Sequence, residues 1–580
     1  MGEHSAEGAA KRRHMATVGV TLAILLALAA YLRFYRLPDQ GILGVDEGRY
    51  VLDALSARAE LNVYAGLVRG KFGEMTGGAE FSLPAFLAQA HAGLSEQHPF
   101  APKPGFACAS AIAMKLTGNV IGACSYVEAV CGVLSVMIVF GFVRDLRNAR
   151  SALIACALLA VSSYHIYFSR NAYPQCSAGA LLLLGVWCHY RWFRTHQNMD
   201  RPTRWPWLVL SGVLFGLSFW FNYQIAGAFP AVALVHVLAC AQTANVKTVA
   251  RAFMGGSLVM LIGFVSVIAV AEAWTYPIIV LYRSYGLVYP HATFLELLAP
   301  RLIGQSGVEW NASGWPLLAY FISVTDGSLY ATAIALPIAA ACAHALYVSA
   351  RRRNVRAVAH PAITYGVVPF AVIWAVFSFK TMQGARTFTS ALPFLFAVTA
   401  ISIDYALRVT ARAPRYALVP AAGCALAGLF FQYPGRLHEV LTIRSAYPRV
   451  VQFAREQQPP SACAAWSAVL EAYGAAYGVE TRSIYADSGE PTPPIFVSDW
   501  QELYNRRAPD FPFGLAPGAV PLASYKHEFG RVFLSIEAFP SFGNTWENIA
   551  WTQQLDVDAN RKLLVYASRD IEHATAGQSH

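Results

Sequence analysis

Long apolar runs dominate this chain, and they limit what it can fold into. A helix needs about 20 mostly apolar residues to cross a bilayer, and about eleven segments meet that requirement. These segments are 15–33, 120–143, 151–168, 176–192, 206–222, 225–241, 252–272, 328–349, 361–379, 388–406 and 416–432. We therefore predict a polytopic α-helical membrane protein with about eleven transmembrane helices.

Basic residues cluster in every second connection between these segments. Such clusters face the cytoplasm in most membrane proteins. They precede the first segment, as in Lys11-Arg12-Arg13, and follow every even-numbered segment, as in Arg351-Arg352-Arg353. One orientation satisfies all of them: the amino terminus is cytoplasmic and the chain after the last span is outside. The first span could instead be a cleaved signal peptide, because Ala27-Leu28-Ala29 resembles a processing site.

Charge density divides the chain into two parts. Charged residues make up 13% of the whole chain, about half of what a soluble domain carries. Residues 1–432 hold 50 of them, and the much shorter remainder, 433–580, holds 28. We predict a transmembrane domain over 1–432 and a soluble α/β domain over 433–580. The net charge of +10 lies in the connections between spans, so we expect no nucleic-acid partner.

The soluble part contains runs typical of both helices and strands. Helices are expected over 439–457 and 464–478. Short apolar runs at 494–497, 532–534 and 563–566 are typical of buried strands. No motif in this part carries chemistry, so either a role in shaping access to a site or a purely stabilising role fits.

Two connections on the outer side are unusually long. They cover residues 34–119 and 273–327. Loops of this length within a compact fold are usually functional. The first contains two shorter apolar stretches, 81–92 and 104–117, which we expect to lie as helices along the outer membrane surface.

A pair of carboxylates, Asp46 and Glu47, follows the first span almost directly. Carboxylates beside a membrane are costly unless they are paired or used. Asp46 could cap a helix that runs through residues 50–55. Alternatively, the pair supplies a general base at the outer mouth of the membrane domain.

Basic residues also occur on the outer side, where the orientation rule disfavours them. Lys103 lies between two prolines and is either an ordinary interfacial lysine or a ligand for a headgroup. Arg170, in the short connection 167–175, marks an anion site or pairs with the acidic residues. Three further basic residues could join them: Arg283, Lys380 and Arg386. Because arginine and lysine bind phosphate, these groups suit a substrate with phosphate at one end and a removable proton at the other.

The motif Asp46-Glu47-x-Arg49-Tyr50 resembles the Asp-Glu-x-Arg-Tyr motif of GT-C glycosyltransferases. Lys103-Pro104 resembles the Lys-Pro motif that follows it in those proteins, and segment 167–175 resembles their second outer loop. The order of spans and the outer carboxy-terminal domain also match. Over residues 15–432 the chain is thus similar to lipid A aminoarabinose transferases and protein O-mannosyltransferases, glycosyltransferase families 83 and 39.

This resemblance implies a GT-C fold and a reaction on the outer membrane face. A sugar would move from a polyprenyl-phosphate donor to a lipid, glycan or protein hydroxyl, with inversion at the sugar. The resemblance implies Asp46 and Glu47 as catalytic residues, and Arg170 and Gln175 as residues of the second outer loop. For the donor phosphate it implies Arg49, Lys103, Arg283, Lys380 and Arg386. No metal or other cofactor is required, because the phosphate leaving group already carries its charge, although relatives with diphosphate donors use a metal.

The chain departs from the family pattern at two places. The second outer loop often carries an acidic residue where this chain has Gln175, which cannot act as a base. Either that acid is dispensable here, or Glu47 or Glu74 takes its place. The usual double proline after the lysine is reduced to Pro104-Gly105. These differences leave the sugar and the acceptor open.

A transporter or lipid flippase is the main alternative function. Such proteins favour charged residues within spans and internal repeats, whereas here the informative residues cluster in outer loops. A receptor or structural membrane protein has no sequence feature in its favour. We expect the protein in a bacterial inner membrane.

Overall fold

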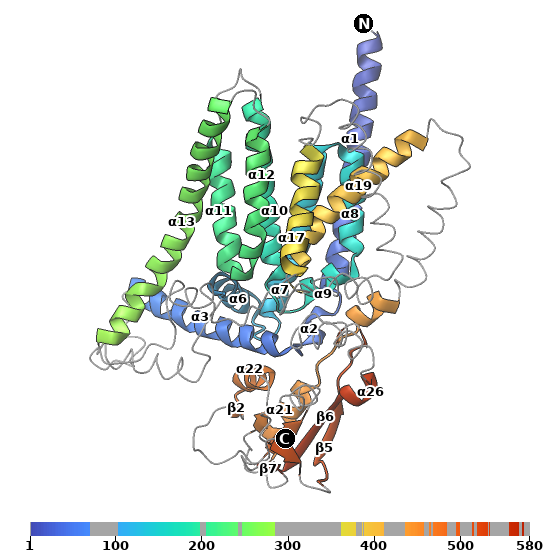
Figure 1. The fold of residues 1–580 in the computed structure, drawn as a ribbon. Helices are drawn as coiled ribbons and strands as arrows, with labels where there is room; N and C mark the ends of the chain where they lie inside the picture. The colour runs from blue at the N-terminus through green and yellow to red at the C-terminus, as the bar shows by residue number, and fades with distance from the viewer. Residues whose placement is uncertain are drawn as a thin grey trace, which may run out of the picture.

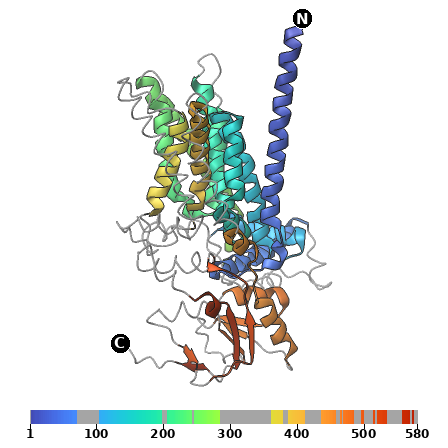
Figure 2. The same ribbon diagram turned by 90° about the vertical axis from the view of Figure 1, so that its right-hand side faces the viewer.

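The computed structural model describes a helical bundle with a small domain at one end (Figure 1). The described residues are 2–69, 103–197, 205–241, 246–284, 361–378, 386, 388–410, 435–457, 463–465, 468–483, 495–498, 513–515, 519–531, 533, 556–567 and 571–573. The amino-terminal end of the first helix points away from the small domain, and this helix stands at the edge of the bundle (Figure 2).

Among the described residues, helices occupy nine of the predicted spans. In chain order they are α1 (Gly2–Phe34), α7 (Ala123–Leu146), α8 (Ala149–Val161) with α9 (Ser163–Arg170), α10 (Gln175–Gln197), α11 (Trp205–Phe221), η1 (Tyr223–Ala228) with α12 (Phe229–Ala241), α13 (Val246–Ser284), η4 (Ile363–Val367) with α17 (Val368–Ser378), and η5 (Phe388–Ala391) with α19 (Leu392–Thr410). The other two predicted spans, 328–349 and 416–432, lie outside the described residues, so the number eleven stays a prediction.

Several of these helices have the length and the surface of membrane spans. Within the described ranges, four are long and apolar enough to cross a bilayer, and the bent pair of α8 and α9 makes a fifth. That pair bends by 59°. Large apolar side chains point outward on α1 and α13, for example Ile24, Met254 and Val270, which are 62%, 67% and 70% exposed. An apolar surface of this extent suits contact with lipid.

Three helices cover the end of the bundle that faces the small domain (Figure 1). They are α2 (Leu37–Gln40), α3 (Val45–Arg69) and α6 (Pro104–Thr117). Helix α6 coincides with the predicted helix 104–117, and its companion 81–92 lies outside the described residues. Because α3 follows the first span through α2, the acidic motif lies at this end of the bundle.

The small domain is built on a five-stranded sheet in the order β2-β1-β3-β6-β5. Its strands are β1 (Cys463–Ala465), β2 (Thr481–Ser483), β3 (Ile495–Ser498), β5 (Ala523–Lys526) and β6 (Lys562–Ala567). Strand β1 runs parallel to β2 and β3, while β6 runs antiparallel to β3 and β5. Strand β3 is buried along its whole length, as its apolar run predicts.

The remaining described elements of this domain are two helices beside the sheet, one short helix and a second pair of strands. They are α21 (Tyr447–Glu456), α22 (Ala468–Tyr477), α26 (Val557–Asn560), β4 (Phe513–Leu515) and β7 (Ile571–His573). Strands β4 and β7 pair antiparallel.

Three local expectations for this domain differ from the structure. The single helix predicted over 439–457 is broken at residues 442–446, where Arg444 forms a bridge with Glu528, and α21 begins only at Tyr447. Residues 463–465 form β1, whereas a helix was predicted from residue 464, because β1 gains hydrogen bonds from strands on both sides and tertiary pairing overrides weak local preference. Phe533, predicted within a strand, is helical. Its ring packs 4.7 Å from that of Phe529, and both rings are buried, so tertiary packing outweighs the local preference for a strand.

Candidate active site

An ion pair between Asp46 and Arg386 marks the centre of the candidate site. Asp46 is the second residue of α3, and Arg386 stands just before η5. The Arg386 guanidinium donates a hydrogen bond to the Asp46 carboxylate, and the two side chains are 9% and 26% exposed. Burial alone raises the pKa of Asp46, but the charge and hydrogen bond of Arg386, with the charges of Lys103 and Arg49, outweigh it and hold that pKa below its usual value.

Lys103 lies on the other side of the acidic motif and is buried. It is the residue before the first turn of α6, followed by Pro104 at a position where proline's fixed φ favours a helix start. Its ammonium donates a hydrogen bond to the Tyr50 hydroxyl and lies 4.2 Å from the centroid of the Tyr50 ring. Lysine is almost never fully buried unless it is paired. The hydroxyl and ring of Tyr50, with the charge of Asp46, supply the partners that allow Lys103 to be buried here.

Tyr173 completes the cluster, and sequence reasoning missed it. The Arg386 guanidinium carbon lies 4.7 Å from the centroid of the Tyr173 ring, a cation–π contact. The Tyr50 and Tyr173 rings meet edge to face at 6.2 Å. The aromatic character of segment 167–175 is visible in the sequence, but which of its tyrosines faces a cation depends on the fold.

Glu47 has a different environment from its neighbour. It is buried, and its carboxylate accepts hydrogen bonds from the backbone amides of Leu43 (2.9 Å), Gly44 (2.7 Å) and Ala172 (2.8 Å). Two of these amides precede α3, so Glu47 satisfies the open amino-terminal end of the helix. The interpretation that Asp46 caps this helix is therefore corrected: Glu47 caps it and also ties the first outer loop to the second.

Arg170 and Gln175, the residues of the second outer loop, are buried in packing contacts. Arg170 donates hydrogen bonds to Gln40 Oε1 and to carbonyls at the end of α1 and just beyond, those of Leu32, Arg33 and Tyr35. A cation suits the carbonyl-rich carboxyl end of a helix. Within the described residues it contacts neither Asp46 nor Glu47, so the pairing considered from sequence does not occur there. Gln175 accepts a hydrogen bond from Asn222 at 3.3 Å.

For the other predicted site residues the structure gives fewer contacts or none. Arg49 is exposed, and its charge contributes to the lowered pKa of Asp46. Burial raises the pKa of Glu471 in α22, and the charge of Arg49 opposes that rise. Arg283 lies in α13, and its side chain is not among the described ones. Lys380 and Glu74 lie outside the described residues. In the described ranges, no group of three or more His, Cys, Asp and Glu side chains could hold a metal ion.

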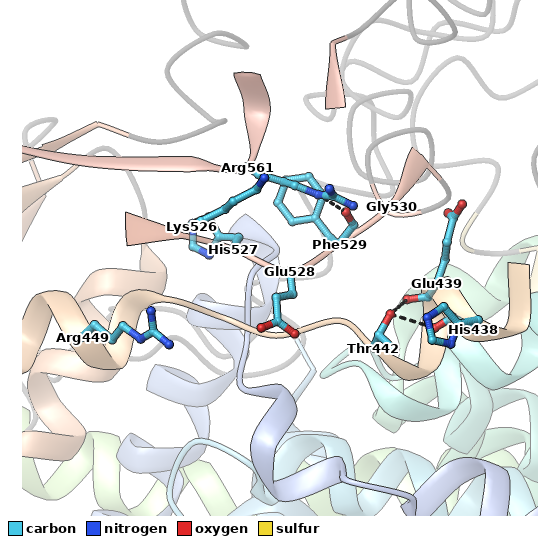
Figure 3. A pocket seen from close by; sticks show the side chains of 10 residues that line it. All are labelled: His438, Glu439, Thr442, Arg449, Lys526, His527, Glu528, Phe529, Gly530 and Arg561. Carbon is cyan, nitrogen blue, oxygen red and sulfur yellow. Dashed lines mark hydrogen bonds between the residues drawn. The ribbon is translucent and has the colours of Figure 1, made fainter. Parts of the chain in front are cut away.

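A cavity of about 390 Å³ lies in the small domain rather than at the acidic motif (Figure 3). Its lining includes three cations and two carboxylates: Arg449, Lys526, Arg561, Glu439 and Glu528. Two of the cations, Lys526 and Arg561, are within 3.2 Å of Asp558. The mixed charges favour no single class of ligand, so we assign no chemistry to this cavity.

Comparisons with known proteins address the fold. A family described as dolichyl-phosphate-mannose-protein mannosyltransferase matches residues 97–269, which run from just before Lys103 into α13. No curated protein matches the sequence significantly. The structure of ArnT from Cupriavidus metallidurans bound to undecaprenyl phosphate aligns over 94% of this chain and 98% of its own, at 13% identity and a TM-score of 0.50. The chain has a GT-C fold.

A second solved structure supports this assignment. The Archaeoglobus fulgidus oligosaccharyltransferase in its apo form aligns over 84% of this chain and 70% of its own, at 13% identity and a TM-score of 0.50. The predicted resemblance to GT-C enzymes such as ArnT and the protein mannosyltransferases is confirmed. With this fold and its apolar helices, the chain is a multi-pass membrane protein.

Proposed function

We propose that this GT-C protein is a glycosyltransferase that uses a polyprenyl-phosphate sugar as donor. The acceptor would be a hydroxyl of a lipid, a glycan or a protein. The observation that carries the proposal is the ion pair of Asp46, a partly exposed carboxylate, with Arg386, near enough to the buried Lys103 for its charge to lower the pKa of Asp46 as well. The undecaprenyl phosphate in the ArnT complex supports a carrier of the same chemical class here.

The reaction would be a single inverting displacement. The acceptor oxygen attacks the anomeric carbon and gives its proton to Asp46, while the bond from that carbon to the phosphate oxygen breaks and its electron pair leaves with the phosphate. A positioned base of this kind contributes about 10²–10⁴-fold to the rate. Negative charge grows on the departing phosphate, so fixed cations beside it lower the barrier.

Arg386 would serve both partners of this reaction. A guanidinium has five N–H donors in a planar fork, and one of its terminal nitrogens bonds to Asp46. A donor phosphate would compete for this cation, loosening its hold on the carboxylate and making Asp46 a stronger base. Lys103 and Arg49 would hold the phosphate as well, and Arg283 and Lys380 stay candidates for the same role.

Glu47 would act by position and not as a base. Its two carboxylate oxygens accept three backbone hydrogen bonds, which fix the start of α3 and the loop that carries Tyr173. Asp46 then points to the cations because its neighbour is anchored. In the same way Arg170 and Gln175 would shape the loop without touching the reacting atoms.

We further propose a bacterial inner membrane location, with the amino terminus cytoplasmic and the domain of residues 433–580 in the periplasm. The opposite placement of the amino-terminal end and the small domain (Figure 1) supports this orientation, as do the basic connections of the sequence. The candidate site then lies at the periplasmic end of the transmembrane domain, 1–432.

The test is release of the carrier from labelled polyprenyl-phosphate sugars by the full chain in nanodiscs. A panel of sugars is offered with lipid, glycan and peptide acceptors. We expect free polyprenyl phosphate and a glycosylated acceptor with at least one combination. A flippase would bind or move the lipid and release no carrier, and that result across the whole panel would contradict the proposal.

A further inference from the structure

The segment that leads into the acidic motif, residues 40–48, is held by the small domain from outside the bundle. The backbone amide of Ser445 donates to the carbonyl of Gln40 at 2.9 Å. Two residues further, the amide of Ile42 donates to the Tyr473 hydroxyl at 3.1 Å. These bonds join the segment directly before the motif to α22 and to the connection before α21.

The glycines of this segment let the small domain approach closely. Gly41 has a φ of +66°, and a Cβ there would lie 2.2 Å from the Tyr473 hydroxyl oxygen. At Gly48 a Cβ would lie 2.3 Å from the backbone nitrogen of Val469 and 2.4 Å from the carbonyl oxygen of Ala468. Real side chains do not reach such distances, and backbone atoms cannot rotate away. The start of α22 therefore rests on the first turn of α3, between Glu47 and Arg49.

The contacts from the small domain come from rigid parts of it. Tyr473 is buried, and its ring stacks on that of Tyr447 at 5.8 Å. Its hydroxyl therefore has little freedom to follow a moving loop. One turn into α22, burial raises the pKa of Glu471, and the charge of Arg49 opposes that rise. Asp46 thus lies in a segment fixed from the bundle side by Glu47 and from the other side by α22.

We propose that the small domain is a positioning element of the active site: Tyr473, and the close contact of α22 with Gly48, hold Asp46 against Arg386. Its catalytic consequence rests on the proposed function, whereas the contact itself does not. Loss of the contact would let the 40–48 segment move, and small displacements of a reacting group cost up to about 10²-fold in rate.

Two variants test this in the full chain, reconstituted in nanodiscs with undecaprenyl phosphate. Tyr473→Phe removes only the hydroxyl that accepts from Ile42, and Gly48→Ala adds one methyl group against α22. Gly435→Ala is the matched control, because a Cβ there meets no atom of the described residues within 4 Å. Hydrogen exchange of the 40–48 amides is measured together with kcat and with KM for the donor.

We expect hydrogen exchange in 40–48 to rise about tenfold in Tyr473→Phe and in Gly48→Ala. In both variants kcat should be about tenfold lower, while KM for the donor stays within about twofold of wild type. Gly435→Ala should behave like wild type. If a variant merely misfolded in part, the fraction of active protein would fall, but exchange would not rise in residues 40–48 alone. Should Gly48→Ala fail to fold, Tyr473→Phe carries the test. Unchanged exchange and kcat in Tyr473→Phe would overturn the proposal. If wild type transfers no sugar, the proposed function fails, and the exchange result alone decides the contact.

Discussion

Arg386 and Asp46 form an ion pair across 340 residues of sequence. The pair joins the first turn of α3 to Arg386, two residues before η5, and the Arg386 guanidinium lies over the ring of Tyr173, in segment 167–175. Three segments that are distant in sequence thus meet at the Arg386 guanidinium. Because the guanidinium favours the ionised form of Asp46, the carboxylate is ready to accept a proton but is also restrained.

Replacing Asp46 by asparagine should abolish most of the transfer. An amide of the same shape cannot accept the acceptor's proton, so we expect kcat to fall about 10²–10⁴-fold. Binding of undecaprenyl phosphate should stay within a fewfold of wild type, since Asp46 does not hold the phosphate. The matched control is Asp39→Asn, an exposed residue that pairs with Arg36 at 3.4 Å. Normal turnover in Asp46→Asn would refute the base assignment.

Replacing Arg386 by glutamine should move the pH profile of transfer. The guanidinium lowers the pKa of Asp46, while burial raises it; without Arg386 the pKa rises. Since the base must be ionised, the loss of kcat/KM on the acidic side should begin at a higher pH than in wild type. The readout is the pH at which kcat/KM falls on the acidic side, measured by carrier release between pH 4 and pH 8. The maximal kcat/KM is not used, because it also depends on the phosphate contacts that Arg386 would make. An acidic limb at the wild-type pH would contradict the role of Arg386.

Two lysines at opposite ends of α6 offer a paired test of donor binding. Lys103 is buried beside Tyr50, whereas Lys115 is exposed in the last turn. A hydrogen bond to a charged group contributes about 1.5–3 kcal/mol, so Lys103→Met should weaken undecaprenyl phosphate binding about tenfold or more. Lys115→Met should leave it unchanged. Equal affinities of the two variants in a lipid titration would remove Lys103 from the phosphate site.

Replacing Glu47 by glutamine should destabilise the protein more than it alters the chemistry. The amide group of glutamine would turn a donor toward at least one of the three backbone amides, at a cost of about 2–3 kcal/mol. We expect a lower unfolding midpoint in detergent, with the acidic limb of the pH profile unmoved. Glu456→Gln is the control, because Glu456 is exposed and, among the described residues, accepts a side-chain hydrogen bond from Gln452 alone. A shifted limb with unchanged stability would restore Glu47 as a titrating catalytic group.

The sequence predicts the spans well because the thickness of a bilayer sets their length. The cluster at the end of the bundle that faces the small domain is harder to predict, because a local sequence pattern does not show which distant residues will be in contact. Asp46 and Glu47 are chemically alike, and their different contacts follow from their positions in the first turn of α3. Asp46 pairs with Arg386, whereas Glu47 accepts hydrogen bonds from three backbone amides. Tyr173 is one of several aromatic residues in its loop. Strand β1, with three residues, is too short to show a period of two.

The most direct test of the account is a structure of the full chain with undecaprenyl phosphate bound. We predict that the phosphate lies within hydrogen-bonding distance of Lys103 Nζ and of the Arg386 guanidinium, with Asp46 beside the oxygen that would carry the sugar. A phosphate bound elsewhere in the protein, with Asp46 and Lys103 both away from it, would contradict the account.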